Sequence, residues 1–207
     1  MTDVLSIDCS PNPDAVTRQL ADRFIAAWCN RHPGKTVHAR DLGAEPVPHV
    51  SQAFVQAITT PLDRRSSAMH AAAAYADTLA AEFLSAERYV LSMPMRILNV
   101  PSTFKAYVEH IFHEGKVFRV GLTGYEGLLG ERKVVCINAR GGDYRAASPI
   151  QRFDVLEPYI RLLFEFCGVL PANIAVINVH AMFADPQSRA AAADDAAAQL
   201  DRLAAIW

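Results

Sequence analysis

The sequence predicts a doubly wound α/β fold, with a five-stranded parallel sheet in the order 2-1-3-4-5 and helices on both faces. Short apolar segments alternate with helical ones along the whole chain. Its 207 residues are enough for one well-buried core and few for two. No repeat or low-complexity linker divides the chain, so residues 1–207 are predicted to form a single domain.

The strand candidates are short and rich in apolar, often β-branched residues, a composition that is typical of strands. They cover residues 4–8, 36–42, 88–92, 133–138 and 174–179. The second is the most polar of the five and suits an edge of the sheet. Because crossovers between parallel strands are right-handed, few topologies remain, and the order 2-1-3-4-5 fits five strands.

The helix candidates repeat apolar residues at helical spacing. They cover residues 17–30, 69–85, 102–114, 153–167 and 190–207, with a helical patch at 54–58 inside the long connection 43–66. Gly168 follows the fourth of these segments and is a natural residue to end a helix. Helices of this length between strands imply crossovers that cover both faces of the sheet.

Composition excludes several classes of function. The net charge of -2 gives no basic face for nucleic acid, and no apolar window is long enough to span a membrane. The four cysteines form no CxxC pair, and no histidines stand at metal-ligand spacing. The sequence therefore predicts a soluble cytoplasmic protein with reduced thiols, no metal, no nucleic-acid partner and no membrane association.

In a sheet of this order, ligands bind outside the carboxyl ends of the strands, near the point where the strand order reverses. The loops that meet there are predicted to be residues 9–17, 93–101 and 139–145. All three have a composition that is unusual for a simple connection, so geometry and sequence indicate the same edge.

The first loop offers the hydroxyl groups of Ser10 and Thr17 just before a helix. Free N–H groups and the helix dipole at such a position favour a phosphate, although both hydroxyls could simply cap the helix. Cys9 and Arg18 also resemble the pair of a cysteine phosphatase, but too many residues separate them, and the chemistry requires a thiol of low pKa.

The second and third loops indicate a flat, partly polar ligand. Met95, Ile97 and Leu98 form an apolar run that suits either a flavin ring or the surface of a partner subunit. Gly141 and Gly142 let the backbone approach a ligand closely, and their N–H groups could bind the pyrimidine edge of a flavin. A tight turn alone would also explain the glycine pair.

Several motifs resemble the FMN-dependent NADH azoreductases, also described as NADH:quinone oxidoreductases, and the resemblance runs nearly from end to end. The similar segments are Pro94-Met95 followed by residues 99–107, residues 117–119 with 126–128 in a hairpin, and Arg140-Gly141-Gly142. The resemblance implies a flavodoxin-like fold and a homodimer with two FMN sites at the subunit interface. It also implies that NADH or NADPH reduces the flavin, which then passes two electrons to a quinone or another small aromatic acceptor such as an azo compound.

The resemblance also assigns residues to the site. It implies that the cofactor is bound by Ser10, Thr17, Pro94, Met95, Arg96, Ile97, Leu98, Ala139, Arg140, Gly141 and Gly142. It implies that Phe118, Phe166 and Tyr144 line the substrate pocket, partly from the second subunit. Tyr144 stands where the family often has a histidine, and its phenol could hydrogen-bond an acceptor oxygen.

At the phosphate loop the sequence departs from the family pattern. Ala15 and Val16 precede Thr17 in a shortened loop where the family carries more hydroxyl groups. Asp14 adds a negative charge that Arg18 could offset. A lost hydrogen bond to a charged group costs about 1.5–3 kcal/mol, so several such losses would weaken FMN binding.

At the ring, Arg96-Ile97 replaces a Tyr-Asn pair and Ala139 replaces a serine. Arg96 could stabilise a reduced anionic flavin, select an acidic acceptor, or lie solvated at the rim of a dimer. These departures leave a second hypothesis open: a diverged relative with weak or lost FMN binding and a biosynthetic or binding role.

Overall fold

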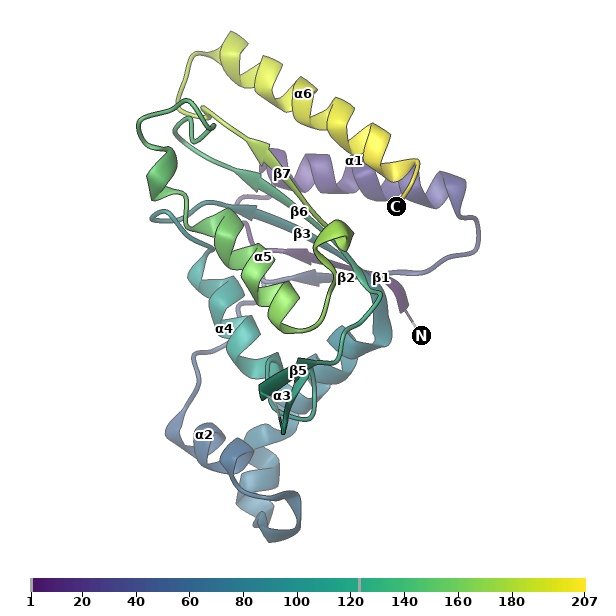
Figure 1. Cartoon of the computed structure of the whole chain (residues 1–207), viewed down its shortest axis with the longest axis vertical. Helices are drawn as coiled ribbons and strands as arrows, with labels where there is room; N and C mark the ends of the chain where they lie inside the picture. Colours follow the sequence, from purple (N-terminus) through teal and green to yellow (C-terminus); the bar gives the residue numbers. More distant parts are fainter. Residues whose placement is uncertain (1, 123) are drawn as a thin grey trace.

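The computed structural model describes residues 2–122 and 124–207 and contains the predicted parallel sheet. Its five strands pair in the order β2-β1-β3-β6-β7, with every pair parallel (Figure 1). The strands are β1 (Thr2–Asp8), β2 (Val37–Asp41), β3 (Ala86–Pro94), β6 (Lys133–Ala139) and β7 (Ile174–Val179). This is the order 2-1-3-4-5 once a separate hairpin is left out of the numbering, so the predicted topology is confirmed.

Helices cover both faces of the sheet (Figure 1). One face carries α1 (Val16–Arg31) and α6 (Pro186–Ala204), and the other carries α3 (Ser67–Ser85), α4 (Ser102–Ile111) and α5 (Leu156–Phe166). Helix α6 begins four residues before the predicted start at 190. There the Asp185 carboxylate accepts the Ser188 N–H, and Pro186 occupies the first turn, where a missing N–H has no cost.

Each face of the sheet has its own apolar core. On one side, Phe24 and Trp28 of α1 meet Trp207, with Phe24 and Trp207 ring centroids 5.0 Å apart. On the other side, Phe83 stacks on Tyr89 at 4.3 Å within a larger cluster under α3, α4 and α5. Because both faces are packed, the strand ends are held by a rigid scaffold.

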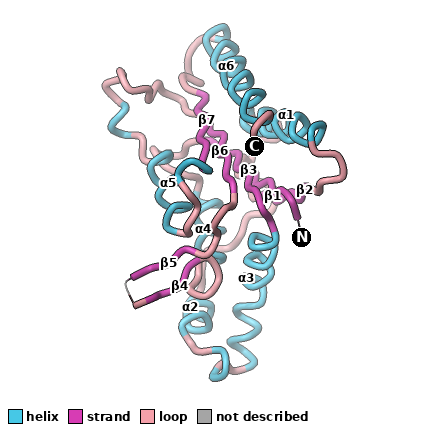
Figure 2. Tube along the Cα trace, turned by 45° about the vertical axis from the view of Figure 1, so that its right-hand side comes forward, coloured by secondary structure: helices cyan, strands magenta, loops and turns pink. Residues whose placement is uncertain are grey.

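A two-stranded antiparallel hairpin, β4 (Phe118–Gly121) and β5 (Gly124–Gly127), stands apart from the main sheet (Figure 2). Its base is fixed at the end of α5, where Leu129 N–H donates to the Cys167 carbonyl at 2.8 Å. A Cβ on Gly127 would lie 2.1 Å from the backbone of Cys167 and Gly168, so only glycine permits this contact. Gly168 ends α5 at φ +90°, as its position predicts.

The long connection after β2 contains α2 (Gln52–Thr59) and a 3-10 turn at Leu62–Arg64. Helix α2 begins at Ser51, whose hydroxyl accepts the Phe54 N–H. Phe54 stacks on His110 of α4 with centroids 4.8 Å apart, which holds α2 beside α3 and α4, away from the sheet (Figure 2). None of the helices within residues 2–122 and 124–207 is long and apolar enough to cross a membrane.

Candidate functional site

Backbone hydrogen bonds at the strand ends bring the three predicted loops together at one edge of the sheet. Cys9 N–H donates to the Ser92 carbonyl at 2.9 Å, which joins the first loop to the end of β3. Met95 N–H donates to the Ala139 carbonyl at 2.8 Å, which joins the second loop to the third. The residues after β1, β3 and β6 therefore lie side by side, as the topology predicts.

The first loop is braced by its own side chains. The Asp8 carboxylate accepts Ser10 N–H at 2.8 Å, the Ser10 hydroxyl accepts Asn12 N–H at 3.2 Å, and the Asn12 side chain accepts Asp14 N–H at 3.0 Å. Such bonds two residues apart fix tight turns. Gly43 packs against the same loop so closely that a Cβ there would lie 2.0 Å from the Ser10 carbonyl oxygen.

The Thr17 hydroxyl lies in the first turn of α1 and has no hydrogen-bond partner among the described residues. Its side chain is buried, and leaving a buried polar group unpaired costs about 1–3 kcal/mol. Helix α1 begins after Ala15 without a side-chain cap, so the capping alternative for Ser10 and Thr17 is wrong. An unpaired hydroxyl at a helix N-terminus is suited to a phosphate oxygen.

Arg18 does not offset Asp14, which corrects the expectation from the sequence. Its guanidinium pairs with Asp8 at 3.0 Å and Asp41 at 2.8 Å and donates to the Ser10 carbonyl at 3.2 Å. Arg18 thus ties α1 to the ends of β1 and β2, and its hydrogen bond lowers the pKa of the Asp41 carboxyl. Burial raises the pKa of the Asp8 carboxyl despite its donors.

Cys9 is not a nucleophile of the phosphatase type. Burial raises the pKa of its thiol well above the ordinary value, and the neighbouring Asp8 carboxylate adds to this shift. A phosphatase needs the thiolate, which a positive environment stabilises. The Cys9–Arg18 alternative is therefore wrong, because Cys9 is a buried thiol and Arg18 is held by two carboxylates.

The second loop makes a strained two-residue turn. Arg96 and Asn99 exchange backbone hydrogen bonds of 2.8 and 3.1 Å, while Ile97 and Leu98 between them have φ values of +42° and +68°. This turn type favours Asn-Gly, and positive φ costs about 1–3 kcal/mol for other residues, most of all a β-branched one. Ile97 is 94% exposed, so no burial of its side chain offsets the strain.

A cavity of about 850 Å³ opens between the first and second loops. It is lined by Cys9, Pro11, Arg96, Ile97 and the start of α4. Most of its surface is apolar, and it is large enough for a small aromatic molecule. The structure therefore joins two of the three predicted loops in one cavity.

The third loop presents two free backbone donors. The carbonyl groups of Arg140, Gly141 and Gly142 accept hydrogen bonds of 2.9 to 3.1 Å from the N–H groups of residues 181–183. Within the described chain, the N–H groups of Gly141 and Gly142 have no acceptor. The turn is thus held by its carbonyl groups, and both N–H groups can bind a ligand with developing negative charge.

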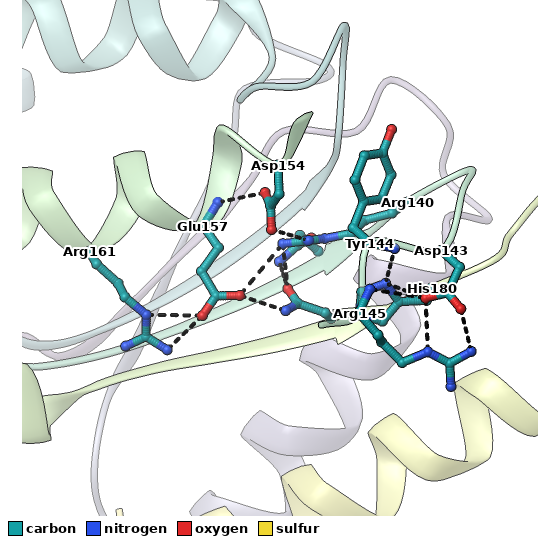
Figure 3. Close-up of polar contacts among 10 residues, drawn as sticks. Arg140, Asp143, Tyr144, Arg145, Asp154, Glu157, Arg161 and His180 are labelled. Atoms are coloured by element: carbon teal, nitrogen blue, oxygen red, sulfur yellow. Dashed lines mark hydrogen bonds and ion pairs between the residues drawn. The ribbon is translucent and has the colours of Figure 1, made fainter. Parts of the chain in front are cut away.

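The Arg140 side chain does not reach toward a ligand, which corrects its assignment as a cofactor contact. Its guanidinium is buried and donates to Asn138 at 2.7 Å and Asn178 at 2.8 Å, and it pairs with Asp154 (Figure 3). Only the backbone of Arg140 lies at the sheet edge. Sequence reasoning missed Asp154 because it placed this residue inside a helix predicted to begin at 153, whereas α5 begins at Leu156.

Tyr144 belongs to the third loop but lines a different hollow from the cavity beside the second loop. This second cavity of about 580 Å³ is mostly formed by charged and polar side chains, among them Arg145 and His180. The Tyr144 ring packs over the Arg140 guanidinium at 5.8 Å, and its N–H donates to His180 Nδ1 at 3.2 Å (Figure 3). Burial, helped by Arg140, lowers the pKa of His180.

Phe118 and Phe166, which were predicted to line the substrate pocket, contact each other with ring centroids 5.0 Å apart. Tyr125, which sequence reasoning missed, completes an aromatic cluster at 5.7 Å from Phe118 and 5.2 Å from Phe166. The cluster joins the hairpin to the end of α5. None of its three residues lines either of the two cavities described above, so within one subunit the cluster is separate from them.

A five-stranded sheet of this order, with a phosphate-type loop after β1 and a glycine turn after β6, defines a flavodoxin-type protein. The chain matches a protein family described by its flavodoxin-like fold over residues 2–203. It is 37% identical to "FMN-dependent NADH:quinone oxidoreductase 2" of Trichormus variabilis, over the full length of both chains. It is also 40% identical to a Nostoc "FMN-dependent NADH:quinone oxidoreductase", covering 96% of this chain and 98% of that one.

Among solved structures, the fold is similar to an azoreductase from Bacillus anthracis. The TM-score is 0.89, with 25% sequence identity over 99% of both chains. The chain belongs to the flavodoxin-like family and, within it, to the family of FMN-dependent NADH:quinone oxidoreductases.

The strain at Ile97 predicts that Ile97→Asn stabilises the protein. Asparagine tolerates positive φ, and the Ile97 side chain contributes little burial, so we expect the free energy of unfolding to rise by about 1 kcal/mol. Urea unfolding measures this change. Ile97→Val keeps the β-branch and is the matched control. Equal stability of the two variants would contradict the strain.

The third loop is expected to loosen in mild acid through His180. Since its pKa is lowered from 6.5, the unfolded chain takes up the proton first as pH falls. Stability from this group is therefore full above pH 6.5 and declines below it, by at most about 1.4 kcal/mol per pH unit. Protonation of His180 Nδ1 would also break the hydrogen bond from Tyr144 N–H. The Asp143 carboxylate, 3.8 Å from Nδ1, would offset part of this loss by attracting the charged ring.

The control for this prediction is His180→Asn, which keeps an acceptor at the position of Nδ1 and does not titrate. The pKa of His113 is also lowered by burial, so both proteins retain that contribution. Urea unfolding at pH 7.5 and pH 5.5 should show a larger loss of stability in the wild type than in the variant. Equal losses would contradict a role for His180.

Proposed function

We propose that this protein is an FMN-dependent oxidoreductase that passes two electrons from NADH or NADPH to quinones or azo compounds. The observation that carries the proposal is the buried, unpaired Thr17 hydroxyl at the start of α1, on the same sheet edge as the free N–H groups of Gly141 and Gly142. The Thr17 hydroxyl is a donor that suits a phosphate group, and the two N–H groups are donors that suit the polar edge of a flavin. Relatives at 37–40% identity bear the corresponding name.

In this proposal the phosphate is bound by Thr17, Ser10 and the backbone N–H groups of the first turn of α1. Ala15 and Val16 cannot donate from their side chains, so the helix backbone supplies most of the contacts. Because Arg18 is held by Asp8 and Asp41, it contributes positive charge only from behind the loop.

The ring is proposed to lie between residues 94–98 and the turn 139–142. Bound FMN supplies two-electron redox chemistry there. The donors of Gly141 and Gly142 stabilise negative charge at the pyrimidine edge when the ring is reduced. The exposed Ile97 and Leu98 cover the apolar part of the ring, and Ala139 contributes through its backbone only.

The acceptor is proposed to enter the cavity beside the strained turn. Arg96 is exposed there and forms no ion pair among the described residues, which favours acceptors that carry an anionic group. Tyr144 lies two residues after Gly142 and lines the second cavity, so in this proposal its phenol hydrogen-bonds an oxygen of an acceptor that extends past the glycine turn.

A homodimer is the proposed form of the protein. Val120 and Leu122 on the hairpin are exposed apolar residues next to the cluster of Phe118, Tyr125 and Phe166. A second copy would cover this surface and could bring the cluster to the partner's cofactor. We further propose that the whole chain is one domain and works in the cytoplasm, with no nucleic-acid partner.

Sedimentation tests the dimer. The wild type should sediment at about twice 22.7 kDa at micromolar concentration, and Val120→Glu should shift it toward the monomer by placing a charge in the interface. Leu62→Glu is the control, because Leu62 is also an exposed apolar residue but lies in the 3-10 turn at Leu62–Arg64 and not on the hairpin. A lone 22.7 kDa species for the wild type would contradict the dimer.

Cofactor binding tests the function. The purified protein should be yellow, and the apoprotein should bind FMN at micromolar concentration and then oxidise NADH or NADPH when a quinone is added. Thr17→Val keeps the shape of the side chain and removes the donor, so FMN affinity should fall by about 1.5–3 kcal/mol, or roughly 10- to 150-fold.

Tyr107→Phe is the matched control for that titration, since its hydroxyl is also buried and unpaired but lies in the apolar core under α4 and lines neither cavity. It should bind FMN within about twofold of the wild type. A colourless wild-type protein that takes up no FMN would overturn the proposal and favour the diverged relative without a flavin.

A further inference from the structure

We propose that Asp154 is a positioning residue that fixes the two ring-facing loops relative to each other. The inference rests on the proposed placement of FMN between residues 94–98 and the turn 139–142. Asp154 contacts neither the cavity beside Ile97 nor the free N–H groups of the glycine turn. It acts through Arg140 on one side and through the start of α5 on the other.

The first connection runs from Asp154 to the glycine turn. Asp154 pairs with the buried guanidinium of Arg140, whose own backbone begins that turn (Figure 3). The side chain of Arg140 is only 1% exposed and also donates to Asn138 at the end of β6 and Asn178 on β7. Removal of its carboxylate partner leaves such a buried cation uncompensated, which favours other positions of the guanidinium.

The second connection runs from the start of α5 to the strained turn. Val155, the residue after Asp154, donates its N–H to the Leu98 carbonyl at 3.1 Å. Leu98 is one of the two residues with positive φ, so this bond holds the turn in its strained form. The carboxylate that orients Arg140 therefore stands beside the donor that holds Leu98.

A third bond fixes Asp154 itself. Its second carboxylate oxygen accepts the Glu157 N–H at 3.2 Å, as an N-cap residue does, so one side chain both caps α5 and pairs with Arg140. Glu157 lies 3.8 Å from Arg140 and is held by Arg161 at 2.8 Å. Glu157 reaches Arg140 only at this longer distance and Arg161 itself contacts neither loop, so Arg161 offers a control on the same helix.

The decisive variant is Asp154→Asn, which keeps an oxygen for the Glu157 N–H and removes the charge that pairs with Arg140. In the apoprotein of this variant, hydrogen–deuterium exchange should be faster than in the wild type at residues 139–144 and 96–99. Exchange in the rest of the sheet edge should change less. The Kd for FMN should rise about tenfold or more, since small displacements of positioned groups have large effects. The flavin midpoint potential should fall, because the donors of the glycine turn would stabilise the reduced ring less well.

Arg161→Gln is the matched control. It cuts the ion pair with Glu157 on the same helix, so it tests for a general effect of weakening α5. Its FMN Kd, midpoint potential and loop exchange should stay within about twofold of the wild type. If Asp154→Asn folds and keeps the wild-type exchange, Kd and potential, then Asp154 is only a helix cap and the proposal is overturned.

Val155→Pro provides a second test that does not depend on the folding of Asp154→Asn. Proline removes the N–H that binds Leu98. The extended Asp154 backbone suits a following proline, and the φ of residue 155 would have to move from −103° toward the proline value of about −65°. Faster exchange at residues 96–99 and a raised FMN Kd support the proposal, and unchanged values overturn it. Failure of the proposed function would give a different result, because the wild type itself would then not bind FMN. Exchange in the apoprotein would still show whether Asp154 and Val155 hold the two loops in place.

Discussion

Parallel pairing is the constraint on which the whole site depends. Because all strands of the sheet run in one direction, β1, β3 and β6 end at the same edge, and hydrogen bonds such as Met95 N–H to the Ala139 carbonyl join the loops that follow them. Residues separated by more than eighty positions in the chain, such as Asp8 and Ser92, thereby become neighbours. Packing on both faces of the sheet makes this edge rigid, so the loops can hold shapes that would be unfavourable alone.

Two charge networks, one half-buried and one buried, then hold the loops from behind. Arg18 is held by Asp8 and Asp41 below the first loop, and Arg140 is held by Asp154 below the third. Burying a charge is costly unless its partners are well placed, and removing one partner leaves the other uncompensated. Both networks therefore favour one arrangement of the backbone and leave the ligand-facing positions to neutral groups, namely hydroxyls and main-chain N–H groups.

The sequence predicts the fold and the ligand edge well because both follow from local patterns. Apolar runs mark the strands, glycine marks the turn after β6, and Thr17 lies just inside a helix start. The directions of the long side chains could not be predicted. Arg18 is oriented by carboxylates 10 and 23 residues away and Arg140 by one 14 residues away, and no periodicity indicates such pairs. The strained turn at Ile97 was hidden for a related reason, since propensity alone argues against positive φ there.

The departures of the phosphate loop and the ring loop from the family pattern share one physical feature. Ala15, Val16, Ile97 and Ala139 all lack a polar side chain where the pattern has one, whereas the backbone donors remain in place. Main-chain N–H groups are fixed by the scaffold and lose no side-chain entropy when they bind a ligand. A site built on them depends less on individual side chains and more on the contacts that hold the backbone. Substitutions behind the loops should therefore affect such a site as strongly as substitutions within them.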